Sequence, residues 1–169
     1  MDKTVIILGS SRSYGNTRKI VEYISKTNNI TIVDLNDYCI GYFDYDFKNS
    51  EDDFIPLMEK LIAKYDNFIF ATPVYWYAMS GILKVFLDRF SDLLHYKKEL
   101  GRMLRGKNMA MLSNSNQNDL INGFSIPFKA SSDYLGMNYL GDIHTWIEDD
   151  KIPTEVSKNI DNFIEIIRN

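Results

Sequence analysis

A short loop of small and hydroxyl-bearing residues follows the first apolar run of the chain. The run Val5-Ile6-Ile7-Leu8 leads into Gly9-Ser10-Ser11-Arg12-Ser13-Tyr14-Gly15-Asn16-Thr17, after which an amphipathic segment begins. Free backbone amides at a helix N-terminus bind anions, and serine and threonine hydroxyls add further donors. The loop therefore predicts a phosphate site.

Two common nucleotide-binding loops are excluded by the spacing. A triphosphate loop needs four residues between its glycines and a lysine after the second, whereas five residues separate Gly9 from Gly15 and Asn16 follows. The dinucleotide pattern G-x-G-x-x-G is also absent from this loop. A monophosphate ligand remains, and FMN is the leading candidate.

A second unusual segment is rich in aromatic residues. It reads Thr72-Pro73-Val74-Tyr75-Trp76-Tyr77-Ala78-Met79-Ser80-Gly81. A flavin ring needs flat apolar contact together with backbone donors and acceptors, which a proline-stiffened aromatic loop could supply. The same aromatics could instead pack on a neighbouring loop or on a second subunit; the phosphate loop opposite favours the flavin interpretation.

Secondary structure must position these two segments. Along the chain, short apolar runs typical of strands alternate with runs whose apolar residues have the 3.6-residue period of a helix. We predict strands over Thr4–Leu8, Ile30–Leu35, Phe68–Thr72, Met109–Ser113 and Tyr139–Trp146. Predicted helices begin near Asn16, after an N-cap at Asp52 or Asp53, and span about Ser80–His95, Asp119–Leu135 and Pro153–Arg168. Gly123 and Pro127 interrupt the fourth of these helices.

This alternation predicts an α/β fold in which helices cover both faces of a doubly wound five-stranded parallel sheet, in one domain over residues 1–169. The expected strand order is 2-1-3-4-5, as in flavodoxin, where FMN lies at the switch point between strands 1 and 3. The loops after strands 1 and 3 would then face each other.

The two segments together resemble a known family. Residues 9–17 are similar to the G-S-P-R-x-x-G-N-T loop of the NAD(P)H-dependent FMN reductases and their multimeric flavodoxin-like relatives. Asp52-Asp53, Thr72–Trp76 and the pattern Met79-Ser80-Gly81-x-x-Lys84-x-Phe86-x-Asp88-Arg89 resemble further motifs of that family. These motifs cover about the first half of the chain.

The resemblance implies the site residues. It implies that the FMN phosphate is held by Ser10, Arg12, Ser13, Asn16 and Thr17. It likewise implies that the isoalloxazine is bound by Pro73, Val74, Tyr75 and Trp76. A third segment, Ser113-Asn114-Ser115-Asn116, lies where the family lines the other side of the flavin, although it would equally suit a turn before a helix.

The cysteine, the histidines and the charged residues of the predicted third helix are not expected to take part in the chemistry. Iron–sulfur members of this group carry several cysteines after strand 2, whereas the segment Asn36–Ser50 has Cys39 alone, and one thiol cannot hold a four-cysteine cluster. We expect Cys39 to be a buried small residue and the aromatics of this segment to border a substrate pocket. We expect Lys84, Asp88 and Arg89 to serve the helix surface or subunit contacts, and His95 and His144 to be structural.

Composition limits the partners. A net charge of −4 gives no global basic surface for nucleic acid. We expect neither a membrane span nor a signal peptide, and a single cysteine fits a reducing cytoplasm. The family resemblance also implies a homodimer or tetramer, and a helix over Ser80–His95 that is apolar around much of its circumference is compatible with a buried interface.

These observations predict an FMN-dependent oxidoreductase that passes electrons from NAD(P)H to a small acceptor such as a quinone, a nitro or azo aromatic, or a flavin. No residue set calls for another chemistry, because the flavin itself performs hydride transfer. The alternative is a flavodoxin-type electron carrier with protein partners and no NAD(P)H site. Its phosphate loop would be one residue shorter and its surface more acidic.

Overall fold

The computed structural model describes residues 3–168. Its main sheet is parallel and has the order β2-β1-β3-β5-β6. The bounds are β1 (Thr4–Leu8), β2 (Thr31–Asp34), β3 (Asn67–Tyr75), β5 (Asn108–Ser115) and β6 (Asn138–Trp146). A two-residue strand, β4 (Ala78–Met79), pairs antiparallel with the end of β3. The predicted flavodoxin-like order is confirmed, with β4 as an addition.

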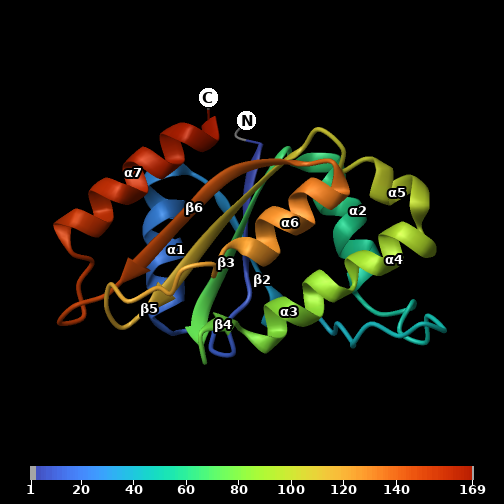
Figure 1. Cartoon of the computed structure of the whole chain (residues 1–169), viewed down its shortest axis with the longest axis horizontal. Coiled ribbons are helices and arrows are strands. Elements are labelled where there is room, and N and C mark those ends of the chain that lie inside the picture. The colour runs from blue at the N-terminus through green and yellow to red at the C-terminus, as the bar shows by residue number, and fades with distance from the viewer. Residues whose placement is uncertain (1–2, 169) are drawn as a thin grey trace.

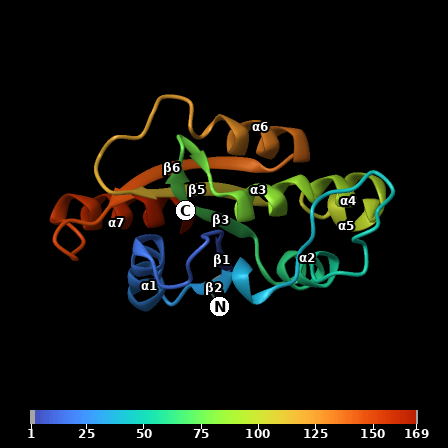
Figure 2. The same cartoon turned by 90° about the horizontal axis from the view of Figure 1, so that it is seen from below.

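Helices cover both faces of this sheet (Figures 1 and 2). One face carries α1 (Asn16–Asn28) and α7 (Thr154–Arg168). The other carries α2 (Phe54–Lys64), α3 (Gly81–Asp88), α4 (Phe90–His95), α5 (Lys98–Arg102) and α6 (Ile126–Leu135). A single 3₁₀ turn, Leu35–Asp37, follows β2.

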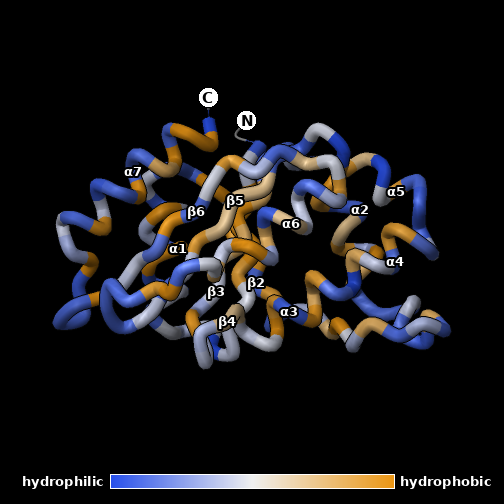
Figure 3. The backbone as a smooth tube through the Cα atoms, in the orientation of Figure 1, coloured by the Kyte–Doolittle hydropathy of each residue, from blue (hydrophilic) through white to orange (hydrophobic). Residues whose placement is uncertain are grey.

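The protein has two hydrophobic cores, one on each face of the sheet, because successive side chains of a strand point to opposite faces. In β1, Val5 and Ile7 pack under α2 and α3, while Ile6 and Leu8 pack under α1 and α7. All four side chains are fully buried, as expected for a parallel sheet covered on both faces. Figure 3 shows the same pattern, with hydrophobic residues along the central strands and hydrophilic ones on the outer helix surfaces. No helix among residues 3–168 is both long and apolar enough to cross a bilayer.

Several predicted boundaries are wrong. The predicted third and fourth strands correspond to β3 and β5, and both are longer than expected. Pro73, Val74 and Tyr75 therefore lie in β3 rather than in a loop, and Ser113–Ser115 lie in β5. The helix predicted near Asp119 begins only at Ile126, because Gly123 adopts a φ of 90° that a helix excludes and Pro127 favours a first turn. The second helix starts as predicted: Asp53 occupies the cap position and the Asp52 carboxylate accepts from the amide of Phe54 at 3.0 Å.

The predicted helix over Ser80–His95 is broken at Arg89, and the expected surface role of Arg89 is also wrong. Its side chain is 1% exposed and lies between the carboxylates of Asp52 and Asp92. The guanidinium also donates to the carbonyls of Gly41 at 3.0 Å and Asn49 at 2.9 Å. Arg89 therefore anchors the long segment between β2 and α2 to the helix layer, which is a structural role.

Cys39 lies in this anchored segment. The expectation that Cys39 is buried is wrong, because its side chain is exposed. Its backbone is nevertheless fixed: its amide donates to the Asp53 carboxylate at 2.7 Å, and its carbonyl accepts from the Asp53 amide at 3.1 Å. The polar backbone groups, and not the thiol, determine the position of residue 39.

Candidate functional site

The strand ends that carry the unusual segments meet at one edge of the sheet. In register, Leu8 of β1 lies beside Ala71 of β3, and Pro73 lies beside Asn114 of β5. The amide of Gly9 continues the first ladder by donating to the Ala71 carbonyl at 2.9 Å. Figure 2 looks onto this edge, the usual place for a ligand in an open α/β sheet.

The loop between β1 and α1 presents free donors at this edge. Among the described residues, the backbone amides of 13–18 have no protein acceptor, and the first hydrogen bond into α1 runs from Lys19 to Gly15 at 3.2 Å. Gly15 is the N-cap residue and supplies no capping side chain. Arg12 is exposed and forms no salt bridge within residues 3–168. The loop is thus suited to an external anion, which would complete the helix N-terminus.

Neighbouring elements hold this loop in place. Nδ2 of Asn36 donates to the Ser10 carbonyl at 2.7 Å and to Ser13 Oγ at 3.2 Å. Ser80 Oγ at the start of α3 donates to the Gly9 carbonyl at 2.6 Å. A Cβ on Gly9 would lie 2.5 Å from Cβ of Leu83, so only glycine lets α3 approach the end of β1 this closely. The loop is therefore fixed from both sides.

A cavity of about 250 Å³ opens beside the loop. Nine of the predicted site residues line it: Ser10, Arg12, Asn16, Thr17, Pro73, Val74, Tyr75, Asn114 and Ser115, together with Gly15 and Asn116. Three others do not: Ser13 faces Asn36, Ser113 is fully buried against His144, and Trp76 lies on the neighbouring cavity. This cavity therefore brings together residues of the loop after β1, of β3 and of the end of β5.

A tight hairpin closes one side of this cavity. Val74 pairs with Met79 and Tyr75 with Ala78, which leaves Trp76 and Tyr77 as a two-residue turn. The Tyr75 hydroxyl lies 2.8 Å from Ser11 Oγ, so the hairpin is hydrogen-bonded to the loop between β1 and α1. A second cavity of about 440 Å³ lies on the other side of the hairpin and shares Val74, Ser115 and Asn116 with the first.

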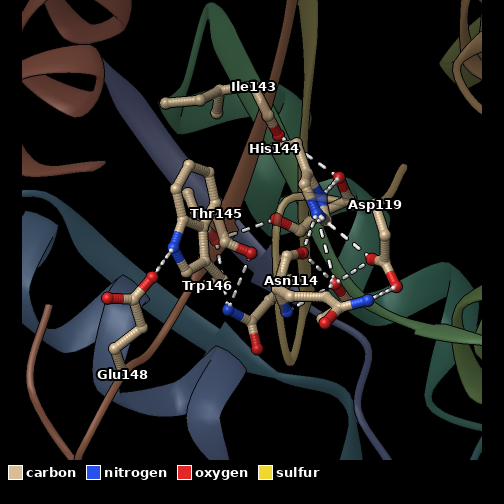
Figure 4. Close-up of polar contacts among 10 residues, drawn as sticks. Asn114, Asp119, Ile143, His144, Thr145, Trp146 and Glu148 are labelled. Atoms are coloured by element: carbon tan, nitrogen blue, oxygen red, sulfur yellow. Dashed lines mark hydrogen bonds and ion pairs between the residues drawn. The ribbon is translucent and has the colours of Figure 1, made fainter. Parts of the chain in front are cut away.

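A chain of polar side chains leads from the sheet to this second cavity (Figure 4). Nδ1 of His144 lies 2.8 Å from Ser113 Oγ, and Nε2 lies 3.0 Å from the Gln117 carbonyl. Because a carbonyl only accepts, Nε2 carries the proton and Nδ1 accepts from Ser113 in the neutral ring. Nε2 also lies 3.2 Å from Ser115 Oγ, which in turn lies 2.7 Å from Oδ1 of Asp119.

The Asp119 carboxylate at the end of this chain is ionised. The hydrogen bond from Ser115 lowers the pKa of Asp119 below its ordinary value of 3.8, with smaller contributions from Gln117 and His144. Half of its side chain is exposed, and it lines the second cavity. No group of three or more histidine, cysteine, aspartate or glutamate residues suited to a metal ion occurs among residues 3–168.

The sequence comparison agrees with this geometry. Residues 3–147 match the model of the NADPH-dependent FMN reductase family. The chain belongs to this family of flavin-dependent oxidoreductases, whose cofactor is FMN. This membership confirms the resemblance inferred from the two loops.

Individual relatives are similar over most of their length. The protein YwqN of Bacillus subtilis (strain 168), described as an NAD(P)H-dependent FMN-containing oxidoreductase, is 29% identical over 154 residues, which cover 82% of each chain. An NADPH-quinone reductase from P. pentosaceus has a TM-score of 0.69 at 18% identity, with 100% of this chain and 99% of that one covered. General stress protein 14 of Treponema denticola, solved with FMN, has a TM-score of 0.65 at 16% identity and 98% coverage of both chains. At these identities the two structures show the fold alone.

Sequence reasoning missed several residues around the cavities. Asn36 supports the phosphate loop, and the only available signal is its place directly after the strand beside β1. Asp119 was predicted to start a helix and Gln117 was given no role, yet both line the second cavity. His144 was given a structural role, and its contacts to Ser113 and Ser115 make that role specific. The aromatics of Asn36–Ser50 line neither cavity.

Proposed function

We propose that this chain binds FMN in the first cavity and oxidises NAD(P)H, passing the electrons to a small acceptor. The observation that carries the proposal is the run of free amides at residues 13–18, which faces the ends of β3 and β5 across that cavity. In this proposal residues 1–169 act as one FMN-binding unit. FMN, when bound, accepts a hydride and returns two electrons to the acceptor.

The phosphate of FMN would be held at the N-terminus of α1. Thr17 is buried in the first turn of this helix, and it lines the cavity together with Ser10 and Asn16. Arg12, exposed at the mouth, would supply a positive charge without having to leave a protein partner. Helix dipole, amides and guanidinium all favour an anion at this point. Ser13 would act indirectly, through its contact with Asn36.

The isoalloxazine would lie between the hairpin and the end of β5. Pro73, Val74 and Tyr75 form one wall, and Asn114 and Ser115 form the other. Asn114 is 3% exposed and donates to the Thr145 carbonyl at 3.2 Å, so this wall is fixed to β6. Ser113 would support the wall from behind through His144. Trp76 would contact the part of the ligand that extends toward the second cavity.

A single anaerobic titration tests the proposal. The purified protein is loaded with FMN, freed of excess flavin, and mixed with NADH or NADPH under argon while the visible flavin absorbance is recorded. Rapid loss of that absorbance, followed by its return on addition of a quinone, is the expected result. Retention of flavin without bleaching by either nucleotide would instead identify an electron carrier. Failure to retain FMN would refute the binding site.

We also propose that the protein works as a homodimer or tetramer in the cytoplasm. An apolar groove between α3, α4 and α6, lined by Leu87, Phe90, Leu94 and Tyr134, supports an association between copies. Sedimentation velocity measures the oligomeric state directly, and a monomer at micromolar concentration would contradict this part of the proposal.

A further inference from the structure

The second cavity has an aromatic wall that is built on an unfavourable backbone. Trp76 and Tyr77 have φ values of 49° and 63°, in the left-handed region. A two-residue hairpin turn with both residues in this region is ordinarily Asn-Gly, because side chains with a Cβ are disfavoured there. Large aromatic residues at such positions indicate that their side chains serve another purpose.

Within residues 3–168, these aromatic side chains also pack against no other ring and lie outside both hydrophobic clusters. Trp76 is 94% exposed and Tyr77 is 67% exposed. Neither contributes to the two hydrophobic cores. Both line the second cavity, together with the apolar side chains of Val74 and Ile121. Flat and apolar surfaces on an open cavity of about 440 Å³ are suited to a planar aromatic ligand.

The opposite wall of the same cavity carries one fixed negative charge. Oδ1 of Asp119 lies 2.7 Å from Ser115 Oγ, and Oδ2 accepts from Nε2 of Gln117 at 3.3 Å. His144, 4.0 Å away, is the only cationic partner of Asp119 among the described residues. No lysine or arginine lines this cavity. A ligand there meets an uncompensated carboxylate whenever His144 is neutral.

We propose that the second cavity is the acceptor subsite and that Asp119 makes it select planar aromatic acceptors that are uncharged or cationic over those that carry an acidic group. This inference rests on the proposed function, since it assigns the substrate class of the same reaction. The reduced nicotinamide is compatible with the carboxylate, because its ring is uncharged and becomes positive on losing hydride. A sulfonated or carboxylated acceptor is repelled.

The size of the discrimination can be estimated for an acidic group of the acceptor at an assumed separation from the Asp119 carboxylate. Two unit charges about 6 Å apart, at an effective dielectric constant of about 40 for a half-hydrated site, repel by about 1.4 kcal/mol. That corresponds to a roughly tenfold difference in an equilibrium constant. Removing the charge of Asp119 should therefore improve an anionic acceptor about tenfold and leave a neutral one within about twofold.

The test compares naphthoquinone with naphthoquinone sulfonate in the FMN-loaded wild type and in Asp119→Asn. Asparagine keeps the size of the side chain and its hydrogen bond from Ser115. Asp161→Asn is the matched control, because Asp161 is exposed on α7, on the other face of the sheet. We expect kcat/KM for the sulfonate to rise about tenfold in Asp119→Asn only. An equal change for both quinones, no change for either, or the same change in Asp161→Asn would overturn the proposal.

A binding measurement separates this inference from the proposed function. Naphthol and naphthalene sulfonate are titrated into the FMN-loaded proteins without any nicotinamide, and tryptophan fluorescence reports binding. Asp119→Asn should tighten the sulfonate about tenfold and leave naphthol unchanged. The result is informative even if NAD(P)H fails to reduce the flavin, since it requires no turnover. Equal dissociation constants for the sulfonate in wild type and Asp119→Asn would refute the role of Asp119.

Discussion

Replacing the hairpin tip by the residues that its backbone favours should make the protein more stable and less able to bind an acceptor. The double variant Trp76→Asn/Tyr77→Gly places Asn-Gly in a turn whose φ values are 49° and 63°. A residue other than glycine, asparagine or aspartate costs roughly 1–2 kcal/mol in this conformation, and asparagine tolerates it through local hydrogen bonds. Removing this strain stabilises the folded protein, but glycine at position 77 offsets about 0.5–1 kcal/mol of the stabilisation because it increases the entropy of the unfolded chain. Little burial is lost, because Trp76 is 94% exposed.

The net gain should be about 1–2 kcal/mol. For a domain of this size each kcal/mol corresponds to roughly 2–4 °C, so the midpoint of thermal unfolding should rise by roughly 2–8 °C. The measurement is made by calorimetry on flavin-free protein, which removes any contribution of bound ligand. Tyr42→Asn is the control: Tyr42 is 77% exposed and is not among the residues with positive φ, so its replacement should leave the midpoint unchanged.

The same double variant should show a higher KM for naphthoquinone, because both aromatic faces of the second cavity are lost. Stability and affinity then move in opposite directions, as expected where a strained segment serves binding. A midpoint that stays the same or falls would refute the argument from backbone strain. An unchanged KM would show that Trp76 and Tyr77 do not contact the acceptor.

Two further predictions concern the phosphate loop and the buried arginine. Arg12→Ala/Thr17→Ala should weaken FMN binding by several kcal/mol, at roughly 1–3 kcal/mol for each charge-assisted hydrogen bond, and unchanged affinity in a flavin titration would exclude this loop as the phosphate site. Arg89→Met should lower the free energy of unfolding by about 3–5 kcal/mol, because it leaves the Asp52 and Asp92 carboxylates without their cation, and urea denaturation should detect this. Burial raises the pKa of Asp52, but hydrogen bonds from Arg89 and from the amides of Phe54 and Gly41 lower it overall. The contribution of Asp52 to stability is therefore complete above its ordinary pKa of 3.8 and is lost as the pH falls through the lowered value; wild-type stability that does not decline in that acid range would contradict this assignment.

The central sheet was predictable because its strands are buried on both sides. Runs such as Val5–Leu8 and Phe68–Ala71 are continuous in apolar residues, which distinguishes them from the helices with their 3.6-residue period. The strand order followed from the alternation with helices. Nine of the twelve predicted site residues meet at one cavity because the carboxyl ends of adjacent parallel strands lie at the same edge.

Arg89 could not be placed from sequence, because its burial depends on partners far along the chain. A periodic helix pattern puts residue 89 on a surface, but the carboxylate of Asp52 and two backbone carbonyls of the preceding loop compensate its charge. The same long-range contacts break the helix: after Arg89 the chain makes a tighter turn, with the Asp92 amide 2.9 Å from the Arg89 carbonyl. Local propensity contains no information about such a network.

The family resemblance implied that Trp76 contacts the isoalloxazine, and the segment around it was predicted to be a loop stiffened by Pro73. Pro73 instead lies within β3, paired with Asn114, and the strand continues to Tyr75, three residues beyond the predicted end. The hairpin pairs of Val74 and Tyr75 place Trp76 at the turn, where it lines the second cavity and not the first. The turn itself carried no sequence signal, since Trp-Tyr lacks the glycine and asparagine by which such turns are recognised.

The two cavities differ in how firmly their walls are held, and this difference has a functional consequence. Register pairs fix Pro73 to Asn114 and Asn114 to Thr145, and all three side chains are buried, so the proposed flavin site is part of the sheet. The acceptor cavity is bounded by the hairpin tip and by residues 116–121, which are mostly exposed and contribute little to either core. Substitutions there change the shape and charge of the cavity without disturbing the sheet. Under the proposed function, a single cofactor site would then serve different acceptors, and Asp119 is the position at which we expect charge selectivity to be altered most readily.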